Sequence, residues 1–118
     1  MSLSTTVSEV AAVETAEAAR KFGVEATTVQ GDITVPEAVD ARVSECEAAL
    51  GSVDVLVNAV GPFPGGTWDK LMFEDWQRTV EGCLYGTYLC SRRVLRSMRD
   101  DGWGRSIRSN ITRQERGR

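Results

Sequence analysis

The segment from Val53 to Asn58 constrains the fold of this 118-residue chain more than any other. It is aliphatic except for Asp54, and it gives way abruptly to Asn58, Ala59, Val60 and Gly61. Such a run is typical of a parallel strand buried on both faces, and the loop after such a strand lies on the edge where open α/β sheets bind ligands. We therefore predict that any binding function lies at this edge. On these residues alone, a strand followed by an ordinary turn is the simpler interpretation.

Helical and strand patterns alternate along the first half of the chain. Residues 8–22 combine alanines with Val10 and Val13 at helical spacing, and a glycine follows as a C-cap. Residues 26–30 are β-branched and predict a strand, whereas residues 36–50, begun by a proline and followed by a glycine, predict a second helix. Short connections between these elements predict an α/β chain with a parallel sheet.

One long amphipathic helix is predicted for residues 73–98. Its apolar stripe recurs every three or four positions, at Trp76, Val80, Cys83, Leu84, Thr87, Tyr88, Val94, Leu95 and Met98. Gly82 and Gly86 interrupt this helix, and each costs up to about 1 kcal/mol relative to alanine, so we expect a kink or a tight contact there. Residues 103–112 are more polar and predict an edge strand or none.

The charge is unevenly distributed, although the net charge is only −3. Residues 1–60 carry three basic and ten acidic side chains, whereas residues 61–118 carry eleven basic and seven acidic ones. Five arginines lie between positions 105 and 118, but no aromatic residue lies beyond position 103, so nucleic-acid binding is not indicated. We expect one α/β domain over residues 1–104 and a polar edge strand or basic flexible tail over residues 105–118.

Cysteine and histidine usage excludes several chemistries. Cys46, Cys83 and Cys90 are odd in number and lack CxxC spacing, so neither a disulfide framework nor a metal site is predicted, and a reducing, cytoplasmic setting fits best. Histidine is absent, which excludes serine–histidine and histidine–metal chemistry. There is no apolar run of about 18 residues, so we expect neither secretion nor a membrane span.

Several motifs in order resemble the short-chain dehydrogenases/reductases. They are Gly31-Asp32-Ile33-Thr34, the segment from Val53 to Gly61, Trp76, Leu84-x-Gly86-Thr-Tyr-Leu-Cys90 and Trp103-Gly104-Arg105. Over residues 10–105 the chain looks like the middle of a 3-oxoacyl carrier-protein or polyol ketoreductase. The resemblance implies a partial Rossmann-like parallel sheet of two or three strands flanked by helices. Residues 1–8 are expected to contain neither a strand nor the glycine-rich phosphate loop.

The resemblance implies a binding site for NAD or NADP. Asp32 and the backbone of Ile33 would lie against the adenine ring, whereas the residues from Asn58 to Gly61 would line the cofactor and steady the central strand. The family usually has two asparagines, an alanine and a glycine after this strand. This chain keeps the first asparagine and the glycine but has Ala59 and Val60 between them.

The resemblance also implies that catalytic residues are missing. The family combines a helix asparagine, a serine after the next strand, and a tyrosine followed four residues later by a lysine. Cys83 stands at the asparagine position, no tyrosine follows Tyr88, and no lysine follows Lys70. We expect a truncated relative that lacks oxidoreductase activity on its own. The alternative is an NAD(P)-binding oxidoreductase or nucleotide-binding module completed by oligomerisation.

Other side chains of the long helix have simpler interpretations. Cys83 and Cys90 are expected to be buried structural thiols rather than nucleophiles, because the stripe is apolar and no histidine accompanies them. Tyr85 and Tyr88 have no lysine nearby in sequence and are interpreted as core or interface residues.

Strand order predicts self-association. The family's order is 3-2-1-4-5-6-7, in which the strands at residues 26–30 and 53–57 would be third and fourth and therefore not neighbours. Either these two strands pair directly, or a second copy supplies the missing edge by exchange. In addition, the helix from Phe73 to Met98 corresponds to one that family members use to pair subunits, so a homodimer is expected.

Overall fold

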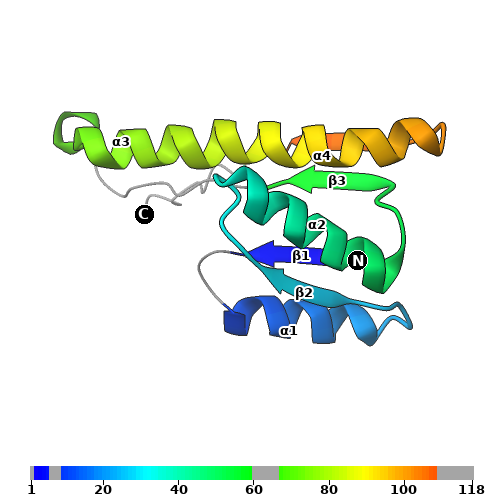
Figure 1. Ribbon diagram of the computed structural model, residues 1–118. Coiled ribbons are helices and arrows are strands. Elements are labelled where there is room, and N and C mark those ends of the chain that lie inside the picture. The colour runs from blue at the N-terminus through cyan, green and yellow to red at the C-terminus, as the bar shows by residue number, and fades with distance from the viewer. Residues whose placement is uncertain (1, 6–8, 60–66, 109–118) are drawn as a thin grey trace.

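The computed structural model describes residues 2–5, 9–59 and 67–108, and within them helices alternate with short strands (Figure 1). The elements are β1 (Ser2–Thr5), α1 (Glu9–Arg20), β2 (Thr27–Gln30), α2 (Pro36–Leu50), β3 (Val55–Asn58), a 3-10 turn (Trp68–Lys70), α3 (Phe73–Val80), a π turn (Glu81–Tyr85), α4 (Gly86–Asp100) and β4 (Arg105–Arg108). The predicted alternation of helix and strand is confirmed. No described helix is both long and apolar enough to cross a membrane.

Strand β1 corrects one prediction, because residues 1–8 were expected to contain no strand. β1 pairs in parallel with β2, and Leu3 lies opposite Thr28. Four residues of mixed polarity carry too little apolar pattern to indicate a strand by themselves. Their extended conformation is stabilised by main-chain hydrogen bonds to the neighbouring strand, a tertiary effect that local sequence does not show.

The described strands form two separate parallel sheets, β1–β2 and β3–β4. Of the two alternatives for the sheet, direct pairing of the strand near residue 26 with the strand near Val53 is wrong, because β2 pairs with β1 instead. In the second sheet Val57 lies opposite Ile107. The strands run in the same direction, so their carboxyl ends lie on one side of the molecule (Figure 1). Exchange of a strand between two copies stays a prediction.

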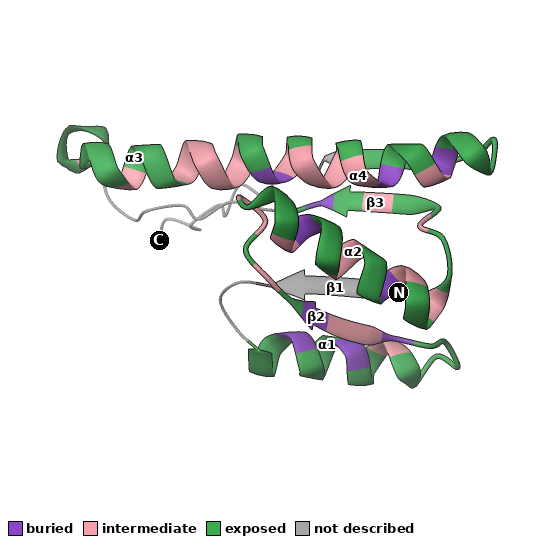
Figure 2. Cartoon of the chain, viewed as in Figure 1, coloured by how far each residue is buried: buried purple, intermediate pink, exposed green. Residues whose placement is uncertain are grey.

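Helices cover the sheets unequally (Figure 2). Helix α1 packs on β1 and β2, α2 contacts both β2 and α4, and α4 lies against β3 and β4. The buried apolar residues come mainly from these contacts and are Ala12, Ala16, Ala26, Val29, Val39, Cys46, Val94 and Met98. The α2–α4 packing therefore joins the two sheets into one body.

Strand β3 is covered on one face, not on both as predicted. Asn58 is buried, and Leu56, which shares its face, is partly covered, whereas Val55 and Val57 are 46% and 56% exposed. Successive residues of a strand point to opposite faces. Asn58 contacts α4, so the opposite face of β3 carries the two exposed valines.

The predicted long helix is confirmed, and one of its two glycines makes the expected tight contact. Gly82 lies in the π turn between α3 and α4, and Gly86 is buried against another segment, as the expected tight contact requires. The apolar stripe is only partly buried. Val94 and Met98 belong to the core, but the stripe residues on α3 and the π turn are more exposed, because α3 extends past the strands (Figure 1).

Candidate functional site

The predicted cofactor residues gather at the carboxyl ends of two strands. Asp32 and Ile33 follow the end of β2, whereas Asn58 is the last residue of β3 and Ala59 comes next. Both strands end on the same side of the molecule (Figure 1). This is the edge where parallel α/β sheets bind ligands. Val60 and Gly61 lie outside the described residues, as do the residues near the family's serine position.

The turn after β2 holds Asp32 in a fixed position. The backbone N–H and the hydroxyl of Thr34 donate to Oδ1 of Asp32 over 2.9 and 2.6 Å, and the N–H of Val35 donates to the Asp32 carbonyl over 3.3 Å. The Thr34 hydroxyl, followed by the Thr34 N–H, lowers the pKa of Asp32, so its side chain is a carboxylate at neutral pH. Because Asp32 is exposed, it can accept hydrogen bonds from an amino group or a sugar hydroxyl.

Ile33 connects this turn to the long helix. Its side chain packs against Gly86, so closely that a Cβ atom on Gly86 would lie 2.9 Å from Cγ1 of Ile33 and closer still to Cδ1. Two glycines in a helical pattern had indicated a close contact, but not its partner, because the two segments lie far apart in sequence.

Asn58 is one of the most buried polar residues described, with 5% of its surface exposed. Its Nδ2 donates to Oγ of Ser91 on α4 over 3.3 Å, and Ser91 Oγ lies 3.5 Å from Oγ of Ser106 on β4. The three side chains therefore link β3, α4 and β4, consistent with the strand-steadying role implied for Asn58. Sequence analysis missed both serines and the role of Thr34. Only Thr34 had a local signal, since an Asp followed two residues later by Thr is a common turn pattern.

The cysteines do not form a reactive cluster. Cys46 is buried, Cys83 and Cys90 are half-buried, and none of the three forms a disulfide. Burial raises the pKa of the Cys90 thiol, which disfavours its nucleophilic form. Cys83, which the resemblance assigns to the family's asparagine position, lies in the π turn, and its carbonyl accepts a hydrogen bond of 2.6 Å from the Thr87 hydroxyl. Among the described residues, no three metal-ligating side chains come together.

The interpretation of Tyr85 and Tyr88 as core residues is wrong, because both side chains are exposed. Tyr85 is 53% exposed and Tyr88 is 57% exposed. The hydroxyl of Tyr88 accepts a hydrogen bond of 2.8 Å from Arg92 on the same helix. The interface interpretation stays a prediction.

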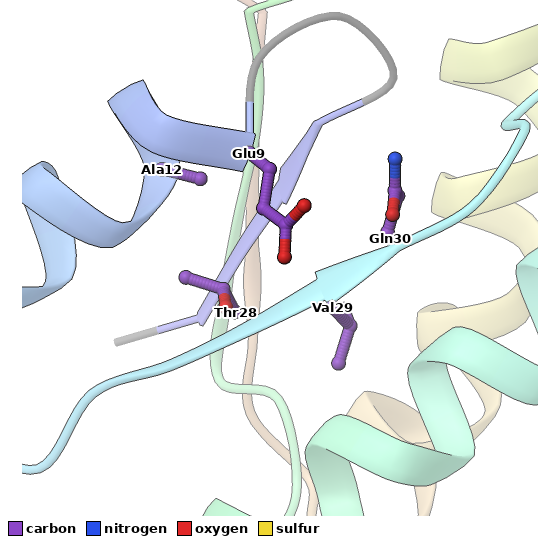
Figure 3. A pocket seen from close by; sticks show the side chains of 5 residues that line it. All are labelled: Glu9, Ala12, Thr28, Val29 and Gln30. Atoms are coloured by element: carbon purple, nitrogen blue, oxygen red, sulfur yellow. The ribbon is translucent and has the colours of Figure 1, made fainter.

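A small pocket lies between the first turn of α1 and the end of β2 (Figure 3). Its volume is about 110 Å³, and it is lined by Glu9, Ala12, Thr28, Val29 and Gln30. Sites for cofactors usually measure about 300–1,000 Å³, so this pocket by itself is too small for a dinucleotide. It adjoins the strand end that leads into Asp32, and the side chain of Glu9 extends from α1 toward β2 (Figure 3).

Comparison with known proteins identifies relatives over most of the chain. The family profile described as short chain dehydrogenase matches residues 2–115. A 3-oxoacyl-(acyl-carrier-protein) reductase from Aquifex aeolicus is 29% identical over 91 residues, which are 77% of this chain and 37% of that protein. An uncharacterized oxidoreductase from Thermotoga maritima is 32% identical over 107 residues, which are 91% of this chain and 42% of that protein.

A solved structure has the same arrangement of elements. The crystal structure of a variant of actinorhodin polyketide ketoreductase with NADPH matches with a TM-score of 0.80 and 30% identity. The match covers 91% of this chain and 41% of the ketoreductase chain. The chain thus spans about two fifths of the length of these relatives.

Proposed function

Because the chain belongs to the short-chain dehydrogenase family, we propose that it binds the adenosine part of NAD or NADP as a portion of an oxidoreductase. The observation that carries this proposal is the turn after β2, where two hydrogen bonds from Thr34 fix an exposed Asp32 carboxylate. Asn58, from the other sheet, ends at the same edge and is itself fixed by Ser91. The NADPH in the related ketoreductase structure supports a nicotinamide cofactor rather than another ligand.

The described residues fit an adenosine group better than a whole cofactor. A fixed carboxylate can accept hydrogen bonds, and Ala59 at the end of β3 is small and exposed. Asp32 and the Ile33 backbone would hold the adenine, and Asn58 and Ala59 would lie along the cofactor. The bound cofactor would supply a hydride acceptor or donor.

We further propose that the 118-residue chain alone does not transfer hydride. The family's tyrosine and lysine pair does not occur in this sequence, because no tyrosine follows Tyr88 and no lysine follows Lys70. Cys83 replaces the family's helix asparagine and, in its half-buried position, is a poor substitute for an amide.

Titration of the purified chain with NAD⁺ and NADP⁺ by isothermal calorimetry tests the binding. We expect a Kd below about 100 μM for at least one of them. The variant D32A should weaken binding about tenfold, whereas D54A, which removes an exposed carboxylate before β3, should leave Kd unchanged. Absence of saturation at millimolar cofactor would contradict the proposal. An equal loss for D32A and D54A would show a general effect of charge instead.

A turnover assay separates this proposal from its alternative. With NADPH and a 3-oxoacyl thioester, the purified chain should consume the reduced cofactor no faster than buffer alone. Turnover above that rate would favour an oxidoreductase completed by oligomerisation, and its rate should then rise more steeply than linearly with chain concentration.

Pairing through the long helix is a further part of the proposal. Leu84, Tyr85 and Tyr88 are each more than half exposed, and Phe73 stacks on Trp76 with ring centroids 5.9 Å apart. Contiguous exposed apolar surface commonly marks a protein–protein interface. A second copy offers the same face, which suits a two-fold dimer.

Light scattering after size exclusion measures this assembly. We expect about twice the 12.9 kDa chain mass at micromolar concentration, and a monomer for L84E. The control A48E places the same charge on the exposed side of α2 and should remain dimeric. A wild-type chain of 12.9 kDa at every concentration would rule out the dimer.

The state of the cysteines supports a proposal for the cellular compartment. Three cysteines without a disulfide are typical of proteins kept in a reducing environment. We therefore propose a cytoplasmic location, which fractionation of the native source with an antibody to the chain would test.

A further inference from the structure

Gly86 is an unfavourable residue for its position in the long helix. A glycine in a helix interior is about 1 kcal/mol less favourable than alanine. Gly86 joins the π turn to α4 and has ordinary α-helical dihedral angles, φ −59° and ψ −47°, which any residue can adopt. It is buried, and the atoms that cover it belong to the side chain of Ile33, more than fifty residues earlier. Glycine is therefore suited to this position because the Ile33 side chain occupies the space that a Cβ atom would need.

The contact leaves no space for even one methyl group. A Cβ on Gly86 would lie 2.9 Å from Cγ1 of Ile33 and nearer still to Cδ1, whereas Cβ of Ile33 would be at an ordinary 3.5 Å. Rotation about χ2 would move Cδ1 but would leave Cγ1 in place. Rotation about χ1 is restricted in a β-branched residue. Either the backbone of Ile33 or helix α4 must therefore shift if Gly86 acquires a methyl group, and both movements change the position of the Ile33 turn relative to α4.

The backbone of Ile33 cannot shift without moving Asp32. The two residues lie within one turn, closed by bonds from Thr34 to Oδ1 of Asp32 and from the N–H of Val35 to the Asp32 carbonyl. These bonds make the turn a unit, so displacement of Ile33 carries the exposed carboxylate with it. On its far side, α4 holds Asn58 through Ser91, five residues beyond Gly86 and about 7.5 Å along the helix axis.

We infer that Gly86 is a positioning residue for nucleotide binding: it receives the Ile33 side chain and thereby fixes the Asp32 carboxylate relative to the end of β3. Helix α4 is then the spacer between the two parts of the site, with Gly86 at one part and Ser91 at the other. The inference rests on the proposed nucleotide binding, but the contact itself can be tested without any ligand.

The test compares the effect of G86A in two backgrounds, the wild-type chain and the variant I33A. I33A removes both atoms that collide with the new methyl group, so G86A should be harmful only when Ile33 is present. In the wild-type background we expect G86A to weaken NAD⁺ binding about tenfold, and in the I33A background less than about twofold. L95A, on the exposed side of α4, is the control for general effects on the helix.

Amide hydrogen exchange of the ligand-free chain gives the second readout. In wild type the N–H groups of Thr34 and Val35 are hydrogen-bonded within the turn. G86A should accelerate their exchange about tenfold, and adding I33A should remove most of this difference. A purely structural role in helix stability would instead change exchange along α4 and leave the turn unaffected.

The outcomes distinguish the proposed nucleotide binding from the positioning contact between Gly86 and Ile33. If wild type does not bind NAD⁺ but G86A accelerates exchange only with Ile33 present, the positioning contact stands and the proposed function fails. If wild type binds and G86A changes neither Kd nor exchange of the turn, the inference is overturned. If G86A alone does not fold, a folded G86A/I33A double variant supports the contact, and an unfolded one contradicts it.

Discussion

The ion pair between Arg93 on α4 and Glu47 on α2 should contribute more to stability than the exposed ion pairs, because its side chains are largely covered between the two helices. Arg93 on α4 donates from Nη2 to Oε2 of Glu47 on α2 over 3.0 Å and from Nε to Asp40 over 2.6 Å. Ser97 donates to the other Glu47 oxygen over 2.9 Å. The side chains of Arg93 and Glu47 are only 24% and 23% exposed. The perturbation that removes the charge but keeps the shape is E47Q.

The sign of the pH dependence follows from the pKa of Glu47. Burial raises this pKa. Hydrogen bonds from Arg93 and Ser97, together with the charge of Arg93, lower it by more than burial raises it, so the pKa of Glu47 in the folded chain lies below its ordinary value of 4.5. A carboxylate whose pKa is lowered by folding stabilises the fold fully above the unfolded-state pKa. That stabilisation is lost as the pH falls below 4.5 and through the folded-state value.

The size of the effect lies between two limits. Exposed ion pairs contribute about 0.2–1 kcal/mol, and hydrogen bonds to charged groups contribute about 1.5–3 kcal/mol. For a pair that is three quarters covered and bonded on both carboxylate oxygens, we expect E47Q to reduce the free energy of unfolding by about 1–2 kcal/mol at pH 7. In a domain of this size that is a Tm decrease of roughly 5–10 °C.

Urea denaturation followed by circular dichroism, at pH 7 and at about pH 3, measures both the size and the sign. The matched control is E45Q on the same helix, because Glu45 is 56% exposed and pairs with Arg42 within one turn over 3.1 Å. E45Q should cost less than about 0.5 kcal/mol. The difference between wild type and E47Q should shrink at the lower pH. Equal costs for E45Q and E47Q, or the same E47Q cost at both pH values, would contradict the stabilising role assigned to the Arg93–Glu47 pair.

Three further predictions concern single side chains. V94A should lower the free energy of unfolding by about 2 kcal/mol because Val94 is 2% exposed, whereas L95A, at a position 44% exposed, should lower it by under about 1 kcal/mol. Comparable losses for the two variants in urea denaturation would contradict the assignment of Val94 to the core. G51A should lower the free energy of unfolding by about 1–3 kcal/mol, because Gly51 ends α2 at φ +86° and ψ −175°. The control is the neighbouring variant S52A, which should lower it by under about 0.5 kcal/mol. A G51A variant as stable as wild type would contradict this backbone conformation. The rate at which Cys90 reacts with iodoacetamide, measured by peptide mass spectrometry across pH, should give an apparent thiol pKa above 9.0. A pKa at or below 9.0 would contradict the burial of this thiol.

Elements whose signals are local were predictable from the sequence. Helix α2 runs over the predicted residues 36–50, because a proline suits its first turn and Gly51 supplies the positive φ at its end. In contrast, the buried face of α1 was not predictable. The sequence shows only the helical spacing of Val10 and Val13, and the structure buries Ala12 and Ala16 instead, while Val10 is 69% exposed. A close helix–strand approach favours small side chains, and that approach is a tertiary property.

Sheet pairing is a second feature that local sequence did not predict in full. The resemblance correctly implied a partial Rossmann-like α/β fold, and small parallel sheets flanked by helices confirm it. Local sequence did not reveal β1, whose four residues are strand only because β2 lies beside them. The same holds for the site. Asp32 and Asn58 were assigned from motifs, but Ser91 lies 33 residues from Asn58 and Gly86 more than fifty from Ile33, and no local pattern connects such pairs.

Within the described residues, the candidate nucleotide edge depends on helix packing, because its strands belong to two sheets. Isolated two-stranded sheets are marginally stable in water, so β1–β2 and β3–β4 both depend on the helices that cover them. Asp32 follows one sheet and Asn58 ends the other, and their separation is set by α2 against α4 and by Ile33 against Gly86. Contacts that stabilise this chain are consequently the same contacts that would orient its ligand. The proposed nucleotide binding therefore depends on these packing contacts as much as on Asp32 and Asn58.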